Sequence, residues 1–211
     1  MKQYQAILYD LDGTVLNTLD MNMIPLMKII EEETKEHWTY EEVLKFASYP
    51  GMKVMEELGI NNKEETYARW VRYVNEYEAG ATLYDGFEQV FEALDQHMIQ
   101  AVVSAKTIEQ YQIDFVSKGL DRYMKTAVLA NDTQKHKPDP EPLLECLKRL
   151  QVEAKDAIYI GDALSDYLAA QNANIDFGYA TWGSVSKDGI DHPDLIIHRP
   201  LELLQLLDHK K

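Results

Sequence analysis

Cysteine and long apolar runs are both scarce in this chain of 211 residues. Cys146 is the single cysteine, so no intrachain disulfide can form, which fits a reducing cytoplasm. No stretch approaches the ~20 apolar residues of a membrane-spanning helix, and the first residues lack the apolar segment of a secretion signal. These absences predict a soluble cytoplasmic protein with no membrane partner.

Basic residues are also few: 21 Lys and Arg stand against 36 Asp and Glu, for a formal net charge of −15. Nucleic acids and anionic membranes are polyanions, so this balance argues against both as partners. A small anionic substrate stays possible, because a local site can be positive inside a negative protein. Hydrophobic residues make up 45% of the chain, which is ordinary for a folded globular protein.

Short apolar runs alternate with amphipathic patterns along most of the chain. Unbroken apolar runs suit strands covered on both faces, as in a parallel sheet; they are 6–9, 99–103, 126–130, 157–160, 175–180 and 195–197. Helical patterns lie between them, at 86–96, 107–118, 140–150 and 164–171. This alternation predicts right-handed βαβ units and a doubly wound, Rossmann-like α/β fold with a parallel sheet.

One block interrupts the alternation, because residues 17–82 contain helical patterns and no convincing strand. We therefore predict a catalytic core of residues 1–16 and 83–211 with an inserted all-helical cap domain, residues 17–82, acting as a lid. An apolar stripe at helical spacing in this block favours core packing over a cofactor site; its members are Tyr67, Trp70, Val71, Val74 and Tyr77.

Two carboxylates, Asp10 and Asp12, follow the first strand and precede Gly13. Alone, this pattern is also typical of a solvated turn or the start of a calcium loop. A calcium loop beginning at Asp10 needs a glutamate at its twelfth position, and that position is Met21. The calcium interpretation is therefore excluded.

A second acidic pair, Asp162 and Asp166, follows the fourth predicted strand. Alone it is typical of a helix start. Ligands bind outside the carboxyl ends of strands in open α/β sheets, so we expect these residues to meet Asp10 and Asp12 at one edge. Clustered carboxylates repel one another unless a cation or proton joins them, and Mg²⁺ is the natural cation for an oxygen-rich site that also receives a phosphate.

Two further residues complete the predicted site. Ser104 ends a strand just before a helix, where a hydroxyl and backbone N–H groups can meet phosphate oxygens, although a helix cap is the commoner role. Lys137 lies in a loop stiffened by Pro138, Pro140 and Pro142, which favours a fixed ammonium directed at phosphate over an ordinary solvated lysine.

In this order, the four pieces resemble the haloacid dehalogenase-like hydrolase superfamily over nearly the whole chain. Residues 10–14 resemble its first motif, Ser104 its second, Lys137 its third, and Asp162 with Asp166 its fourth. The 17–82 block resembles the family's helical cap. The Lys137-Pro138 segment and Thr181-Trp182-Gly183 look most like the phosphoglycolate phosphatase-like branch.

The resemblance implies a Mg²⁺-dependent phosphatase that acts on a small phosphorylated metabolite through an aspartyl-phosphate intermediate. Asp10 would be the nucleophile, and Asp12 would protonate the leaving group and then accept a proton from water. Ser104, Ala105 and Lys137 would bind the phosphoryl group.

For the metal, the resemblance implies the carboxylates of Asp10 and Asp162 and the backbone carbonyl of Asp12. Asp166, Gly13 and Thr14 would lie next to these ligands without binding the metal themselves. Asp166 would orient Lys137 or a metal-bound water, and Gly13 would leave the end of the strand free of a side chain.

Two positions depart from the family pattern, and several alternatives stay open. Asn17 stands where aspartate is frequent, and Ala105 where asparagine or glycine is frequent, so the substrate subclass is undetermined. A phosphosugar mutase or a pyrophosphatase of the same superfamily shares the motifs, whereas Asp12 argues against a dehalogenase. From another class, a non-enzymatic phospho-aspartate signalling or scaffold protein is conceivable. We expect a monomer or a weak homodimer.

Overall fold

The computed structural model describes residues 2–47, 49 and 51–207. The chain divides into two compact units, one of Met1–Asn17 with Leu83–Lys211 and one of Thr18–Thr82. Among the described residues, no helix is both long and apolar enough to cross a bilayer.

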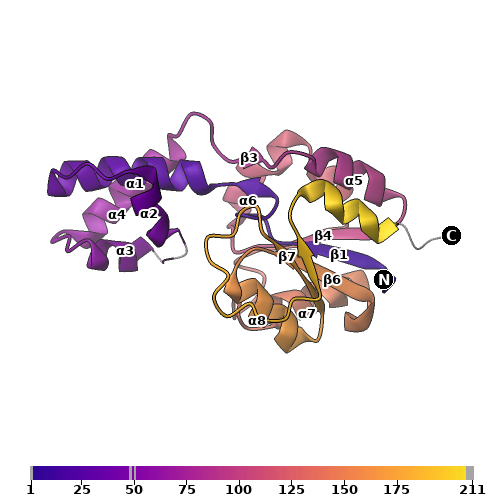
Figure 1. The fold of residues 1–211 in the computed structure, drawn as a ribbon. Helices are drawn as coiled ribbons and strands as arrows, with labels where there is room; N and C mark the ends of the chain where they lie inside the picture. Colours follow the sequence, from indigo (N-terminus) through magenta and orange to yellow (C-terminus); the bar gives the residue numbers. More distant parts are fainter. Residues whose placement is uncertain (1, 48, 50, 208–211) are drawn as a thin grey trace. The chain divides into compact units, whose positions relative to one another are not determined.

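The larger unit is built on a six-stranded parallel sheet in the order β5-β4-β1-β6-β7-β8 (Figure 1). Its strands are β1 (Ala6–Tyr9), β4 (Ile99–Val103), β5 (Thr126–Val128), β6 (Ala157–Gly161), β7 (Asp176–Ala180) and β8 (Leu195–Ile197). The predicted doubly wound α/β fold is confirmed. The strand predicted over 126–130 ends earlier, at Val128.

Helices flank this sheet and follow from the amphipathic patterns: α5 (Phe87–Asp95), α6 (Ile108–Asp114), α7 (Glu141–Leu150) and α8 (Leu164–Ala173). The 3₁₀ segments are η2 (Val116–Lys118), η3 (Asp121–Tyr123), η4 (Ala154–Asp156) and η5 (Pro200–Leu207). The helix predicted over 107–118 is therefore two pieces, α6 and η2. Thr107 begins α6 with a capping box, in which its hydroxyl accepts from the backbone N–H of Gln110.

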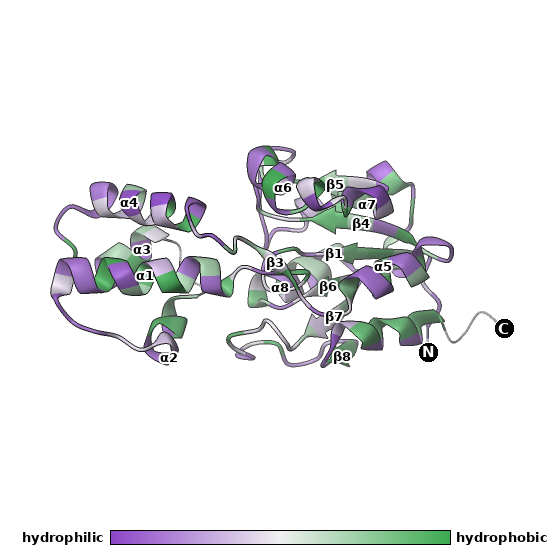
Figure 2. Ribbon diagram, turned by 90° about the horizontal axis from the view of Figure 1, so that it is seen from above, coloured by the Kyte–Doolittle hydropathy of each residue, from purple (hydrophilic) through white to green (hydrophobic). Residues whose placement is uncertain are grey.

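The strands of the sheet are largely hydrophobic, as the green colouring of β1 and β4 in Figure 2 shows. All four residues of β1 are buried. Ala6 and Leu8 pack in one cluster with the apolar faces of α7 and α8, while the ring of Tyr9 contacts those of Phe87 and Phe91 of α5 on the other face. Burial on both faces explains why the strand sequences are unbroken apolar runs.

The smaller unit is helical and has its own apolar core. It contains α1 (Leu19–Thr34), α2 (Tyr40–Val43), η1 (Leu44–Phe46), α3 (Gly51–Glu57) and α4 (Lys63–Asn75). Trp70 is buried in this core, and the partly buried Tyr67 and Val74 pack against it, so the core-packing interpretation of the stripe is confirmed for these three. Val71 is 39% exposed and Tyr77 lies beyond the end of α4, so the stripe prediction was wrong at these two positions.

Two short strands that the sequence did not indicate, β2 (Leu16–Asn17) and β3 (Thr82–Leu83), pair where the chain leaves the larger unit and returns to it. Two residues carry too short a pattern to predict a strand.

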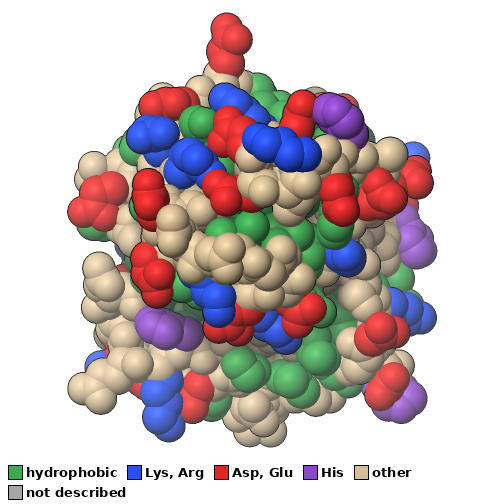
Figure 3. All heavy atoms as spheres, turned by 90° about the vertical axis from the view of Figure 1, so that its left-hand side faces the viewer, with side chains coloured by type: hydrophobic (Ala, Val, Ile, Leu, Met, Phe, Trp, Pro, Cys, Tyr) green, Lys and Arg blue, Asp and Glu red, His purple; other side chains and the backbone are tan. Residues whose placement is uncertain are grey.

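Figure 3 shows acidic and basic side chains interspersed over the face turned toward the viewer. Basic groups are therefore present on that face, even though acidic residues outnumber basic ones in the chain.

Candidate active site

Three polar side chains follow three neighbouring strands of the sheet. Asp10 follows β1, Ser104 follows β4, and Asp162 follows β6. Because β1 lies between β4 and β6 and all three run in parallel, these residues meet at the carboxyl edge of the sheet. The next sheet strand after β1 is β4 on one side, and the next after β6 is β7 on the other, and open α/β sheets bind ligands at such a change of direction.

Lys137 lies between two of the predicted site carboxylates. Its Nζ is 2.7 Å from Oδ1 of Asp10 and 2.7 Å from Oδ1 of Asp166. The hydroxyl of Tyr159 accepts a hydrogen bond from the same ammonium at 2.9 Å and donates one to Asp166 at 3.0 Å. Asp166 also accepts from the backbone N–H of Ala163 through Oδ2. Every member is largely buried, so the group is rigid.

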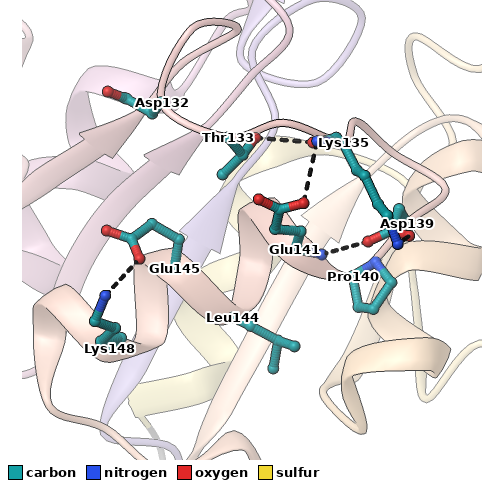
Figure 4. Close-up of a pocket in the computed structure, with 9 residues that line it drawn as sticks. All are labelled: Asp132, Thr133, Lys135, Asp139, Pro140, Glu141, Leu144, Glu145 and Lys148. Carbon is teal, nitrogen blue, oxygen red and sulfur yellow. Dashed lines mark hydrogen bonds and ion pairs between the residues drawn. The ribbon is translucent and has the colours of Figure 1, made fainter.

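The loop that carries Lys137 is held by carboxylates at the start of α7 (Figure 4). The side chain of Glu141 accepts hydrogen bonds from the backbone N–H groups of Gln134 and Lys135. Oδ1 of Asp139 accepts from the N–H of Glu141 at 3.0 Å. These bonds join the loop to the helix, so that both prolines and side-chain caps restrict the position of Lys137.

The charges around Lys137 shift the pKa of several groups. Burial and the nearby Asp166 and Asp12 raise the pKa of Asp10 to about 7, although Lys137 opposes the shift. Burial alone would lower the pKa of Lys137, but Asp10 and Asp166 outweigh it and the pKa lies well above the ordinary value. Burial, Asp166 and Asp10 raise the pKa of Asp162 well above its ordinary range. The site thus holds more carboxylates than one ammonium can neutralise.

The loop after β1 lies directly against Asp162. The hydroxyl of Thr14 donates to Oδ1 of Asp162 at 2.8 Å. Gly13 has a φ of +82°, and a Cβ there would clash with the carboxylate of Asp162, so only glycine allows this approach. The indole N–H of Trp182 donates to the carbonyl of Thr14 at 2.8 Å, so the 181–183 segment supports the same loop.

Asp12 is not one of the three clustered carboxylates and pairs with a different lysine. Its Oδ1 is 2.9 Å from Nζ of Lys106, whose side chain is 7% exposed. Lys106 also lies 2.6 Å from Oδ2 of Asp114, at the end of α6. Burial alone would lower the pKa of Lys106, but Asp12 and Asp114 outweigh it and raise the pKa, so the ammonium stays charged.

Ser104 is buried, and its Oγ accepts a hydrogen bond from the backbone N–H of Lys106 at 3.3 Å. Its own N–H donates to the carbonyl of Val128. Ala105 is exposed between them. The turn after β4 therefore places a hydroxyl at the carboxyl edge of the sheet, next to the strand that ends at Asp10.

Three residues of this arrangement were missed by the sequence analysis: Lys106, Asp114 and Tyr159. Tyr159 is hidden inside an apolar strand, where a tyrosine predicts only core packing. Lys106 lies two residues after Ser104, and that spacing was a usable signal for a residue at the carboxyl edge. Asp114 shows no signal, because only the folding of α6 brings it to Lys106.

An acidic group fit for a cation is present at this edge. Asp10, Asp162 and Asp166 each offer an oxygen, and these oxygens all lie within 4.8 Å of one another. All donors are hard oxygen atoms, which suit Mg²⁺ or Ca²⁺ better than a softer metal. Burial and the neighbouring carboxylates raise the pKa of Asp10 and of Asp162, so a cation bound here would favour their charged forms. The residues therefore fit a divalent cation.

A buried aspartate paired with lysine beside a possible cation site, at the carboxyl edge of a parallel sheet, defines an α/β enzyme of the phosphate-handling type. The model of the haloacid dehalogenase-like hydrolase family matches residues 7–180. This chain belongs to that family, and it is a hydrolase.

Several known proteins are similar to this chain over nearly its whole length. The pyrophosphatase PpaX of Anoxybacillus flavithermus is 26% identical over 212 residues, covering 96% of each chain, and that of Bacillus velezensis is 24% identical over 211 residues, covering 97% of each. A crystal structure from Lactobacillus plantarum, provisionally assigned as a phosphoglycolate phosphatase, is 28% identical with a TM-score of 0.83, covering 97% of this chain and 100% of the other.

Proposed function

We propose that this hydrolase is a Mg²⁺-dependent phosphatase that cleaves a small phosphomonoester through an aspartyl-phosphate on Asp10. The observation that carries the proposal is the meeting of Asp10 with Lys137, Asp162 and Asp166 at the carboxyl edge of the sheet. A buried carboxylate next to a fixed ammonium suits attack on a phosphoryl group, since the ammonium offsets the charge that the two anions bring together.

In the first half-reaction, an oxygen of Asp10 attacks phosphorus and the bond from phosphorus to the leaving oxygen breaks. Asp12 gives its proton to that leaving oxygen. In the second half-reaction, Asp12 takes a proton from water, the water oxygen attacks phosphorus, and the bond to Asp10 breaks to release inorganic phosphate. Ser104 and Lys137 hold the phosphoryl oxygens in both steps.

The residues proposed to hold Mg²⁺ are Asp10, Asp162 and the backbone carbonyl of Asp12, with Asp166 alongside. Bound there, the ion would offset the combined negative charge of the carboxylates and the phosphoryl group. Thr14 and Gly13 keep Asp162 in place for this task, and Asp166 with Tyr159 keeps Lys137 directed at Asp10.

A steady-state assay of phosphate release tests the proposal, with phosphoglycolate, sugar phosphates, nucleoside monophosphates and pyrophosphate as substrates and Mg²⁺ present. Wild-type protein should release phosphate from at least one of them, and Asp10→Asn should release none, because an amide cannot attack phosphorus usefully. Asp95→Asn, an exposed aspartate at the end of α5, is the matched control. Turnover by Asp10→Asn at the wild-type rate would contradict the proposal.

Pyrophosphate is a second candidate substrate, favoured by full-length relatives named pyrophosphatase PpaX. Phosphate is a better leaving group than an alkoxide and needs less help from an acid. Asp12→Asn should therefore lose less activity on pyrophosphate than on an alkyl phosphate. The ratio of kcat/KM for the two substrates in the wild-type protein ranks the candidates.

We also propose that residues 17–82 form a lid that positions the substrate and excludes bulk water. Each unit has its own apolar core, so a core joined by a short linker has the means to fold. The truncated protein should keep turnover of nitrophenyl phosphate and lose most activity on metabolites. Unchanged kinetics on metabolites in a folded truncation would rule out the lid.

A further inference from the structure

Lys106 is a buried cation of the site for which neither the motifs nor the proposed chemistry has a use. It sits two residues after Ser104, with 7% of its side chain exposed. Burying an ammonium is costly unless it is paired, and this one is paired twice, with Asp12 at 2.9 Å and Asp114 at 2.6 Å. Because burying this ammonium costs free energy, we expect Lys106 to have a function beside Asp12.

The position of Lys106 is fixed from three directions. Its backbone N–H donates to Oγ of Ser104 at 3.3 Å, and its carbonyl accepts from the N–H of Ala130 at 3.0 Å. Its ammonium is held by Asp114, and α6, which carries Asp114, begins with the capping box of Thr107. The ammonium therefore meets Asp12 from a rigid support.

Asp12, in contrast, has few contacts of its own. Its side chain is 42% exposed, and Lys106 is its one ion-pair partner among the described residues. Oδ1 is buried and makes no hydrogen bond, so its contact with Lys106 is an ion pair. The exposed part of the carboxylate can face a leaving group. A general acid acts within about 2.6–3.2 Å of the oxygen that it protonates, and a freely rotating carboxylate spends little time there.

We propose that Lys106, held by Asp114, is a positioning residue that orients the Asp12 carboxylate for proton transfer and links it to the phosphate-binding turn at Ser104. Asp12 is engaged through one oxygen, and the other stays available for the leaving group and for water. This inference rests on the proposed function, because it takes Asp12 as the acid and base. Lys106 itself transfers no proton.

A purely structural role is the competing explanation, in which Lys106 only neutralises the buried Asp114. Three variants separate the two: Lys106→Met, Asp114→Asn, and both together. Lys106→Met leaves Asp114 buried without its cation, and the melting temperature should fall. The double variant removes both charges, and most of that fall should be recovered. Lys155→Met, an exposed lysine, is the control.

The kinetic test compares leaving groups in the double variant. An alkyl phosphate needs a proton on its leaving oxygen, whereas dinitrophenolate leaves without one. We expect kcat for the alkyl phosphate to fall about 10–100-fold, a part of the ~10²–10⁴-fold that acid–base catalysis contributes, with KM unchanged. With dinitrophenyl phosphate, a rapid first turnover should remain as a burst, because only hydrolysis of the aspartyl-phosphate then depends on Asp12.

Two results would overturn the inference: wild-type turnover of the alkyl phosphate in the double variant, or an equal loss of the first turnover for both leaving groups. Asp12→Asn is measured in parallel. If Asp12→Asn itself shows no dependence on the leaving group, the assignment of Asp12 as acid and base fails. If Asp12→Asn shows that dependence and the double variant does not, only the role of Lys106 fails.

Discussion

Two buried lysines at the carboxyl edge of the sheet each lie between two aspartates, yet their surroundings differ in charge. Lys137 joins Asp10 to Asp166 at 2.7 Å each, and Lys106 joins Asp12 to Asp114 at 2.9 and 2.6 Å. Only the first group has a further carboxylate, Asp162, close by. With one ammonium against three carboxylates, the Lys137 group therefore has a larger surplus of negative charge than the Lys106 group, where one ammonium faces two carboxylates.

The difference in charge between the two lysine groups corresponds to two different roles in the proposed reaction. Burial and, after it, the neighbouring carboxylates raise the pKa of Asp10 to about 7 and that of Asp162 well above its ordinary range, and a bound cation would lower both. Asp12 and Asp114 do not belong to the acidic group that could hold a metal ion, and the Asp12 side chain is 42% exposed. A nucleophile held ready for a metal and an acid held in one orientation are what the proposed phosphatase needs.

Removing the metal should have the largest effect on turnover and should distinguish the Lys137 group from the Lys106 group most clearly. EDTA should stop turnover completely and Mg²⁺ should restore it, because the Lys137 group depends on added positive charge. Ca²⁺ should compete with Mg²⁺ without supporting catalysis, since it readily binds a carboxylate through both oxygens and would occupy the attacking oxygen of Asp10. The measurement is a steady-state assay with titrated metals.

Elemental analysis of the EDTA-treated protein is the control for metal removal. Full activity in demonstrably metal-free protein would contradict the assignment of a cation to the acidic group. Full activity with Ca²⁺ alone would keep the metal site but contradict the account of how Asp10 is presented.

Asp12→Asn tests the second group and should have the next largest effect. We expect kcat on an alkyl phosphate to fall by about 10²–10⁴-fold, because both half-reactions lose their proton carrier. The first turnover of dinitrophenyl phosphate should be spared, as measured by stopped-flow absorbance. An equal loss of that first turnover would show that Asp12 acts on the nucleophile's side of the site.

Lys137→Met should cost both activity and stability. Loss of one fixed group that stabilises the transition state reduces kcat by about 10²–10³-fold. Breaking a buried ion pair costs about 3–5 kcal/mol, because the carboxylates of Asp10 and Asp166 stay buried without their cation. Urea denaturation with Lys155→Met as the control measures the second effect, and no loss of stability would contradict the buried pairing.

The strands and the Lys137 group were within reach of the sequence, because both depend on local patterns. Unbroken apolar runs such as 157–160 mark strands buried on both faces, and residues that follow such strands share one edge. The resemblance to a family then suggested roles for Asp10 and Lys137, which are proposals tested by the experiments above.

The pairing of Lys106 with Asp114 was out of reach, because it depends on contacts between distant elements. Asp114 lies on the last turn of α6, and nothing in its neighbourhood distinguishes it from a solvated aspartate. Tyr159 is likewise one aromatic residue among apolar ones. Strands of two residues, such as β2, are too short to carry a period.

The smallest expected effect is on stability as a function of pH in EDTA. Asp10 and Asp162 have pKa values raised above those of the unfolded chain, so these two groups bind more protons in the folded protein than in the unfolded chain between about pH 4 and pH 7. Their contribution to the free energy of unfolding therefore falls as pH rises through that window.

Asp162→Asn isolates one part of this loss. The amide keeps an oxygen for the hydroxyl of Thr14 and removes the charge, so the metal-free variant should be more stable than wild type at pH 8 and closer to it at pH 5. Each kcal/mol gained raises Tm by about 2–4 °C. Added Mg²⁺ at pH 8 should stabilise wild type more than the variant, reducing or reversing the difference. Asp95→Asn should show neither change, and a stability difference that is the same at both pH values and unmoved by Mg²⁺ would show that the charge of Asp162 is already neutralised within the protein.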